Sequence, residues 1–425
     1  VTQVIIIEND VEFKKFLELY TSTIPSIYYF LTDTIKHPHH NEISFLYVKM
    51  DDDYVLPFNH NDCKNLDKKY LELLKTENKK YVWDVKSLKH IIDFNNMVDI
   101  NTLYYLKYNT EIDLYEIENN TRLFYNSKFY HTEDLNSVIP LMKQIEFLEK
   151  LILSLNLDYS LENDEYNEIS DALFNIENVG LYKDSELVYT QYNPFTATGR
   201  PSNRFGGVNY AALNKEDETR KSYTSRFGTE GKLVEFDYDA YHLRLIGEVV
   251  DYKFPEGSVH EHMSKFYGCD YQESKRRSFQ YLYGYIPIDV VQMNSFFGKV
   301  QDFIDDLWKS YKKEKYIDTN IYSRRIFSQN VSDMNKNKLF NYFIQSLETE
   351  TNMKMLSNLF NTIKDYKSKL VLYNYDSFLF DFNIEDGIDY LKLLKKEIEL
   401  NGKFPTSISW GLNYHEMEDI TEKFV

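Results

Sequence analysis

Apolar positions in the first 128 residues follow two different periods. Short continuous apolar runs have the length of buried strands, whereas longer segments repeat their apolar residues at helical spacing. Strands are predicted at 4–7, 27–31 and 43–48, and helices at 11–20, 68–75 and 85–92. This mixture predicts an α/β arrangement for the N-terminal part of the chain.

The remainder of the chain has a helical half and a strand-rich end. Residues 134–180 and 258–312 carry apolar stripes at helical spacing, and the clearest stripe lies at 138–157. Four glycine and proline residues within 196–209 predict a loop there.

A carboxylate ends an apolar strand in the middle of the chain. The strand is predicted at 233–237, it ends on Asp237, and a helix is predicted at 241–250. Carboxylate oxygens are ligands that Mg²⁺ prefers. The alternative interpretation, which this segment taken alone favours, is that Asp237 or Asp239 is the N-cap of the helix.

A second carboxylate lies in a turn between two apolar strands. Strands are predicted at 370–373 and 378–382, and Asp376 lies in the turn 374–377 between them. Such a hairpin places Asp376 at one edge of a sheet. An aspartate in a plain β-turn is the alternative interpretation.

Two further segments carry cations. Lys275, Phe279 and Tyr283 follow one another at four-residue spacing, which places them on one helix face. A lysine beside two rings can bind a triphosphate and stack a base, and the alternative is a solvated lysine beside core rings. Arg200 and Arg204 in the glycine-containing loop suit phosphates, and an ordinary surface loop is the alternative there.

The order of these segments carries more information than any one of them. The chain reads TATGRPS at 196–202, EFDYDAYHLRLIG at 235–247, KRRSFQYLYG at 275–284 and LYNYDSFLFD at 372–381. This order resembles the family A DNA polymerases, the bacterial polymerase I and phage type, in their TxTGRxS segment and motifs A, B and C. Lesser similarities lie at 258–260, 315–325, 341–345 and 408–411, so the resemblance covers about 138–415.

The resemblance implies a fold in two domains. Residues 1–130 resemble more faintly the family's 3′–5′ exonuclease domain, which has a ribonuclease H-like fold. Residues 131–425 would form the right-hand polymerase domain. Within it, the thumb and the approach to the palm would span 131–230, the palm 231–250 and 365–425, and the fingers with the return to the palm 251–364.

The resemblance also implies roles for single residues. Asp237, Asp376 and Lys275 would be catalytic, and two Mg²⁺ ions would be bound by Asp237, Asp376 and the backbone carbonyl of Tyr238. The nucleotide would be bound by Lys275, Phe279, Tyr283, His242 and His260. The primer–template DNA would be bound by Arg200, Arg204, Gln345, Arg324 and Arg325.

Departures from the family pattern bear on specificity and on proofreading. His242 stands where motif A has the glutamate that helps to exclude ribonucleotides, so sugar selection is open. Leu31 and Leu88 stand where two exonuclease aspartates are expected, and Asp33 replaces a glutamate. Leucine cannot bind a metal, so the N-terminal domain is predicted to be structural.

Composition and charge limit the partners. The chain has 49 basic and 67 acidic residues and a formal net charge of −18, which excludes a protein whose whole surface coats nucleic acid. Few basic contacts predict weak, salt-sensitive DNA binding and low processivity without a protein partner. Two cysteines exclude a disulfide scaffold.

The prediction is therefore a DNA polymerase that adds dNTPs to a primer 3′ end without proofreading. The alternatives are a non-catalytic replication factor derived from a polymerase, and a ribonucleotide-using or primase-like enzyme. No apolar run approaches the length of a membrane span, and a cytoplasmic location is expected, the host cytoplasm for a phage protein, with an organelle as the alternative.

Overall fold

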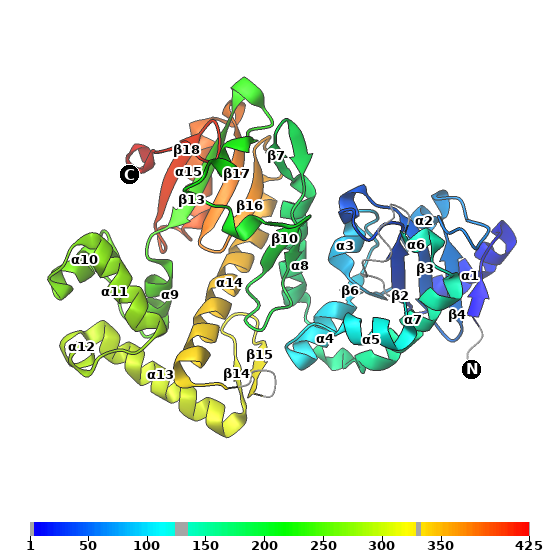
Figure 1. Ribbon diagram of the computed structural model, residues 1–425, viewed down its shortest axis with the longest axis horizontal. Coiled ribbons are helices and arrows are strands. Elements are labelled where there is room, and N and C mark those ends of the chain that lie inside the picture. The colour runs from blue at the N-terminus through cyan, green and yellow to red at the C-terminus, as the bar shows by residue number, and fades with distance from the viewer. Residues whose placement is uncertain (1–3, 124–134, 329–332, 425) are drawn as a thin grey trace. The chain divides into compact units, whose positions relative to one another are not determined.

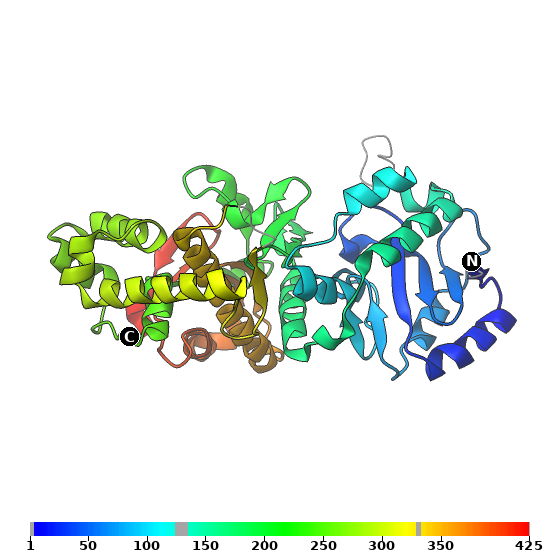
Figure 2. The same cartoon turned by 90° about the horizontal axis from the view of Figure 1, so that it is seen from below.

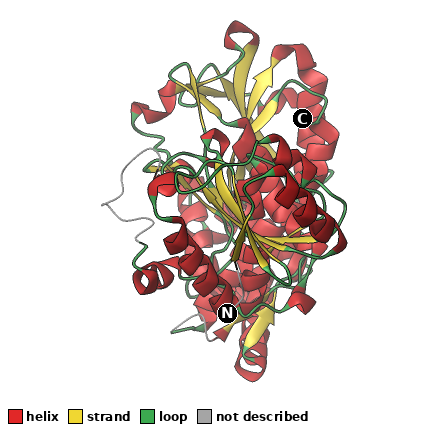
Figure 3. Cartoon of the chain, turned by 90° about the vertical axis from the view of Figure 1, so that its right-hand side faces the viewer, coloured by secondary structure: helices red, strands yellow, loops and turns green. Residues whose placement is uncertain are grey.

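The computed structural model describes residues 4–123, 135–328 and 333–424 (Figure 1). The chain forms two compact units, Val1–Phe174 and Asn175–Val425. Helices and strands are both abundant (Figure 3), which confirms the predicted α/β fold class. The domain boundary predicted between residues 130 and 131 lies outside the described residues, so it stays a prediction.

The first unit is built around a six-stranded sheet with the order β1-β4-β3-β2-β5-β6. Its strands are β1 (Val4–Ile6), β2 (Ser26–Leu31), β3 (Ile43–Lys49), β4 (Asp53–Pro57), β5 (Lys80–Val82) and β6 (Met97–Asp99). Its helices are α1 (Asp10–Ser22), α2 (Lys69–Leu73), α3 (Val85–Lys89), α4 (Ile100–Tyr108), α5 (Leu114–Thr121), α6 (Leu135–Val138) and α7 (Leu141–Leu155). The central strand β2 runs antiparallel to β3 and parallel to β5.

The side chains of β2 explain why this sheet is covered on both faces. Ile27 and Tyr29 belong to one hydrophobic cluster, with Phe13 and Phe16 of α1. The alternate residues Tyr28 and Phe30 belong to another cluster, which α7 supplies. Because successive strand residues point to opposite faces, one continuous apolar run fills two cores.

The second unit holds a five-stranded sheet with the order β16-β17-β13-β18-β19. These strands are β13 (Gly231–Tyr238), β16 (Lys369–Asn374), β17 (Ser377–Asn383), β18 (Thr406–Gly411) and β19 (Met417–Asp419). Three smaller sheets comprise β7 (Leu181–Lys183), β8 (Glu186–Val188) and β12 (Tyr223–Thr224); β9 (Tyr192–Asn193), β10 (Ser202–Phe205) and β11 (Val208–Asn209); and β14 (Tyr316–Asp318) and β15 (Arg325–Phe327).

Helices of 6 to 28 residues accompany this sheet. They are α8 (Asp164–Val179), which contains the boundary between the units, α9 (Tyr241–Val249), α10 (Val259–Tyr267), α11 (Tyr271–Tyr283), α12 (Ile288–Met293), α13 (Ser295–Glu314), α14 (Lys336–Ile363) and α15 (Gly387–Ile398). Helices α10 to α13 gather to one side of the sheet (Figure 2), where α10 contacts α11 and α12 contacts α13. Within the described residues, no helix combines the length and the apolar character needed to cross a membrane.

The predicted strands and helices are present within a few residues of their expected bounds. Of the predicted loop 196–209, residues 196–201 lie outside any helix or strand, and the remainder contains β10 and β11. Gly206 and Gly207, both with positive φ, form the turn between these two strands. Two of the glycines that predicted a loop therefore belong to the turn of a hairpin.

Candidate active site

Asp237 and Asp376 lie side by side at one end of the central sheet. Asp237 is near the end of β13, where it pairs with Ser377 of β17. Asp376 lies in the two-residue turn between β16 and β17, and its backbone carbonyl accepts a hydrogen bond of 2.9 Å from the Tyr238 backbone N–H. This bond holds the turn against the end of β13, so two carboxylates that are 139 positions apart in sequence become neighbours.

The turn that carries Asp376 is held by further contacts. Tyr375 has φ of 62°, in the left-handed region that two-residue hairpins favour but that strains a residue with a side chain. The Asn352 side chain on α14 donates a hydrogen bond of 2.6 Å to the Tyr375 carbonyl. The Arg200 guanidinium lies 3.7 Å from the centre of the Tyr375 ring.

The two carboxylates have an electrostatic environment that favours cations. Burial and the nearby negative charges of Asp376 and Glu235 raise the pKa of Asp237 to about 7. Burial and the nearby Glu348 carboxylate also raise the pKa of Asp376. A divalent cation would relieve this repulsion, so the residues fit Mg²⁺ bound by Asp237, Asp376 and the Tyr238 carbonyl.

Helix α11 supplies the facing wall of the site. Its N-cap Asp270 accepts a hydrogen bond from the Glu273 backbone, and the helix then presents Lys275, Phe279 and Tyr283 on one face. The rings of Phe279 and Tyr283 are parallel within 8°, with centroids 5.9 Å apart. The Ser274 hydroxyl donates a hydrogen bond of 2.8 Å to the His260 carbonyl, which fixes α11 against α10.

These residues line one cavity of about 740 Å³. Of the residues with predicted roles, the cavity is lined by Asp237, Tyr238, Asp376, Lys275, Phe279, Tyr283, His242, His260, Arg200 and Gln345. Most of these ten side chains are polar, so the cavity lining is not an extension of the hydrophobic core. The structure thus brings ten predicted residues together, and their roles stay a prediction.

Three predicted DNA ligands lie outside the cavity lining. Arg204 is exposed on β10, and Arg325 is exposed on β15 with its Nε 3.6 Å from Asp318. Arg324 is only 2% exposed, and its guanidinium donates a hydrogen bond of 3.3 Å to the Ser346 hydroxyl on α14. The DNA contacts of all three arginines stay a prediction.

Some cavity residues carried no signal in the sequence. Lys215, Arg220, Glu235, Glu348 and Tyr414 also line the cavity. Glu348 follows Gln345 by three residues on α14, so helical spacing places both on one face once Gln345 is assigned. Glu235 precedes Asp237 by two residues on β13, so strand spacing places both on one face in the same way. Lys215, Arg220 and Tyr414 lie outside the long helices and the central sheet, so no spacing of this kind identifies them.

The first unit has no comparable set of carboxylates at the predicted exonuclease positions. Leu31 ends β2, and Leu88 is fully buried in a hydrophobic cluster. Asp33 is buried, and its Oδ1 accepts hydrogen bonds from the Ile35 and Lys36 backbone.

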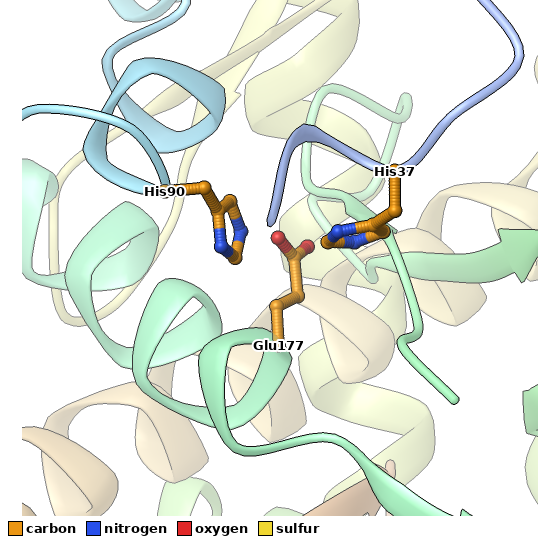
Figure 4. A group of neighbouring side chains, drawn as sticks. All are labelled: His37, His90 and Glu177. Carbon is orange, nitrogen blue, oxygen red and sulfur yellow. The ribbon is translucent and has the colours of Figure 1, made fainter. Parts of the chain in front are cut away.

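A group of histidines lies elsewhere in this unit. The rings of His37 and His90 meet edge to face with centroids 5.0 Å apart (Figure 4), and Nδ1 of His37 accepts a hydrogen bond from the His39 backbone. Glu177, also labelled in Figure 4, belongs to the second unit. These contacts give the two histidines packing partners within their own unit.

The chain shares its fold with a solved polymerase domain. The chain resembles the solved structure of the "POL domain of Pol1" from M. smegmatis, in complex with DNA primer-template and dNTP. The TM-score is 0.72, and the match covers 96% of this chain and 99% of that one at 13% sequence identity. No protein-family model and no curated protein matches the sequence. At this identity, the likeness establishes the shared fold.

Proposed function

We propose that this protein is a template-directed DNA polymerase of family A that adds dNTPs to a primer 3′ end. The observation that carries the proposal is the pair of buried carboxylates, Asp237 and Asp376, held together at a cavity that Lys275 also lines. The resemblance of four ordered motifs and the shared polymerase fold support it.

Each wall of the cavity suits one part of the reaction. Two Mg²⁺ ions bound at Asp237 and Asp376 would activate the primer hydroxyl and offset the charge on the transferring phosphate. Lys275 binds the triphosphate, and the parallel rings of Phe279 and Tyr283 pack on the base. Arg200 and Gln345, on the same cavity, contact the primer–template end.

Primer extension tests the proposal. The parent protein is expected to add only the templated dNTP, in a reaction that EDTA stops. Replacement of Lys275 by alanine removes a charge-assisted contact to the triphosphate, so KM for dNTP is expected to rise about 10- to 100-fold. The exposed Lys265 on α10 is a matched control, and Lys265→Ala is expected to behave as the parent does.

Two outcomes would contradict the proposal. Extension that ignores the template would exclude a template-directed enzyme. A protein that binds primer–template DNA but extends no primer would be the non-catalytic replication factor. The net charge of −18 further supports a protein partner that supplies a basic surface for processive synthesis.

We also propose that the first unit does not proofread. Leu31 and Leu88 cannot bind metal, and Asp33 is engaged by its own turn. The parent is expected to leave single-stranded DNA intact in Mg²⁺ without dNTPs, as gel analysis of a 3′-terminal fragment would show. Degradation from the 3′ end that Asp33→Ala abolishes would contradict this proposal.

A further inference from the structure

Glu348 is a buried acid shared between two basic side chains. It lies in the middle of α14 and is 1% exposed. Its Oε2 lies 3.3 Å from Nε of Arg200, and its Oε1 lies 2.9 Å from Nε2 of His242. A buried carboxylate is costly unless it has such partners, so the three side chains depend on one another.

The other nitrogen of His242 is also engaged. Nδ1 of His242 forms a hydrogen bond with the Tyr283 hydroxyl at the end of α11. Glu348 at Nε2 and Tyr283 at Nδ1 therefore contact both ring nitrogens, and the contact with Glu348 restrains the orientation of the ring.

The position of His242 and Tyr283 in the cavity indicates which part of a bound nucleotide they contact. His242 lies in the first turn of α9, a few residues after Asp237, and Tyr283 shares a helix face with Lys275 and Phe279. Under the proposed function, phosphates bind near Asp237 and Lys275, and the base packs on Phe279. The sugar that joins them then lies against His242.

We infer that Glu348 is a positioning residue that holds His242 against Tyr283 and thereby sets the choice between deoxyribo- and ribonucleotides. The inference rests on the proposed function. It differs from a general stabilising role because Glu348 acts through one ring, whose displacement changes the space beside the sugar.

The test is the ratio of kcat/KM for a dNTP to that for the matching rNTP, opposite one template base. In Glu348→Ala the ring loses its anchor, and this ratio is expected to fall about 10-fold or more, mainly through a lower KM for the rNTP. Glu348→Gln keeps nearly the same shape and an oxygen beside Nε2 of His242, so its ratio is expected to stay within about threefold of the parent ratio. If Glu348→Ala does not fold, Glu348→Asp replaces it in the test. Its shorter side chain moves the carboxylate away from His242, so this variant is also expected to lower the ratio.

Two controls separate positioning from stability. Glu350 is a second buried acid on α14, but it accepts hydrogen bonds from the Ile321 and Tyr322 backbone and does not line the cavity. Glu350→Gln is expected to lower stability without changing the ratio. Adding Glu348→Ala to His242→Ala is expected to change the ratio no further, because the effect passes through the ring.

The possible failures are distinguishable. A parent that extends no primer would overturn the proposed function and this inference together. A parent that extends primers, with an unchanged ratio in Glu348→Ala and Glu348→Asp or with fully additive effects in the double variant, would overturn only the inference.

Discussion

Primer extension by Asp237→Asn is expected to be slower than extension by the parent by about 10³-fold or more in kcat. Asparagine has nearly the shape of aspartate, but it presents one neutral oxygen where the carboxylate presents a charge. The site would then bind divalent cations with Asp376 as its main remaining acid. The reaction would lose electrostatic stabilisation at the phosphate, where negative charge develops.

The loss of activity should come without a loss of stability. Asp237 and Asp376 are buried like charges, and their repulsion contributes to the raised pKa of Asp237, about 7. Removing one charge relieves this repulsion in the absence of metal. Thermal unfolding in EDTA is therefore expected to give Asp237→Asn a Tm equal to or above that of the parent.

A matched substitution on the surface provides the control. Asp389 on α15 has a side chain that is 90% exposed and pairs with Lys392. Asp389→Asn is expected to extend primers at the parent rate. Extension at the parent rate by Asp237→Asn as well would show that this carboxylate does not take part in the reaction.

The pair Asp237 and Asp376 could be predicted because both lie in local patterns. Each follows an apolar strand, and a two-residue turn leaves little freedom for where Asp376 points. The pairing of β13 with β17 then brings the two carboxylates together, since Asp237 pairs with the residue directly after Asp376. The separate segments did not indicate that Asp237 and Asp376 share one site, and the order of the motifs did.

Residues whose role depends on distant partners could not be predicted in this way. Glu348 contacts Arg200 from 148 positions away in sequence, and its spacing from Gln345 indicates a shared helix face but not this partner. Arg324 contacts Ser346 on α14, and its own segment does not indicate this partner either. The strand β10 could not be predicted from its own residues, because it forms through pairing with β9 and β11.

The stability of the first unit is expected to fall as pH rises from 5 to 8, because of Asp99. This residue is 3% exposed and caps α4, where it accepts a hydrogen bond of 2.9 Å from the Asn101 backbone. Burial, and then the nearby charge of Asp84, raise its pKa from 3.8 to about 7, although backbone N–H groups oppose the shift. Asp99 therefore holds a proton in the folded state at pH values where the unfolded chain has lost it.

The sign follows from this difference in bound protons. Between pH 4 and 7 the folded state binds more protons than the unfolded state, so the free energy of unfolding decreases as pH rises, by about 1.4 kcal/mol per unit at most. The contribution is fully present below the unfolded pKa of 3.8 and is lost as pH rises through about 7. Between pH 5 and 8 the loss from this one group is about 3 kcal/mol.

Asp99→Asn isolates this effect from every other titrating group. Asparagine is an equally good N-cap and carries no proton that dissociates, so the variant lacks this one pH dependence. Its advantage over the parent in free energy of unfolding is expected to grow by about 3 kcal/mol from pH 5 to pH 8. Hydrogen exchange of the α4 amides in the full chain reports this local stability.

The exposed Asp113 is the matched control, because it caps α5 by the same bond to a backbone N–H. Asp113→Asn makes the same change at an exposed cap, so an advantage that grows with pH in Asp99→Asn alone would come from the burial of Asp99. An advantage of Asp99→Asn that stays constant from pH 5 to pH 8 would show that Asp99 is ionised throughout. The core of the first unit would then hold a buried negative charge beside Asp84, and a compensating cation would have to be sought among its neighbours.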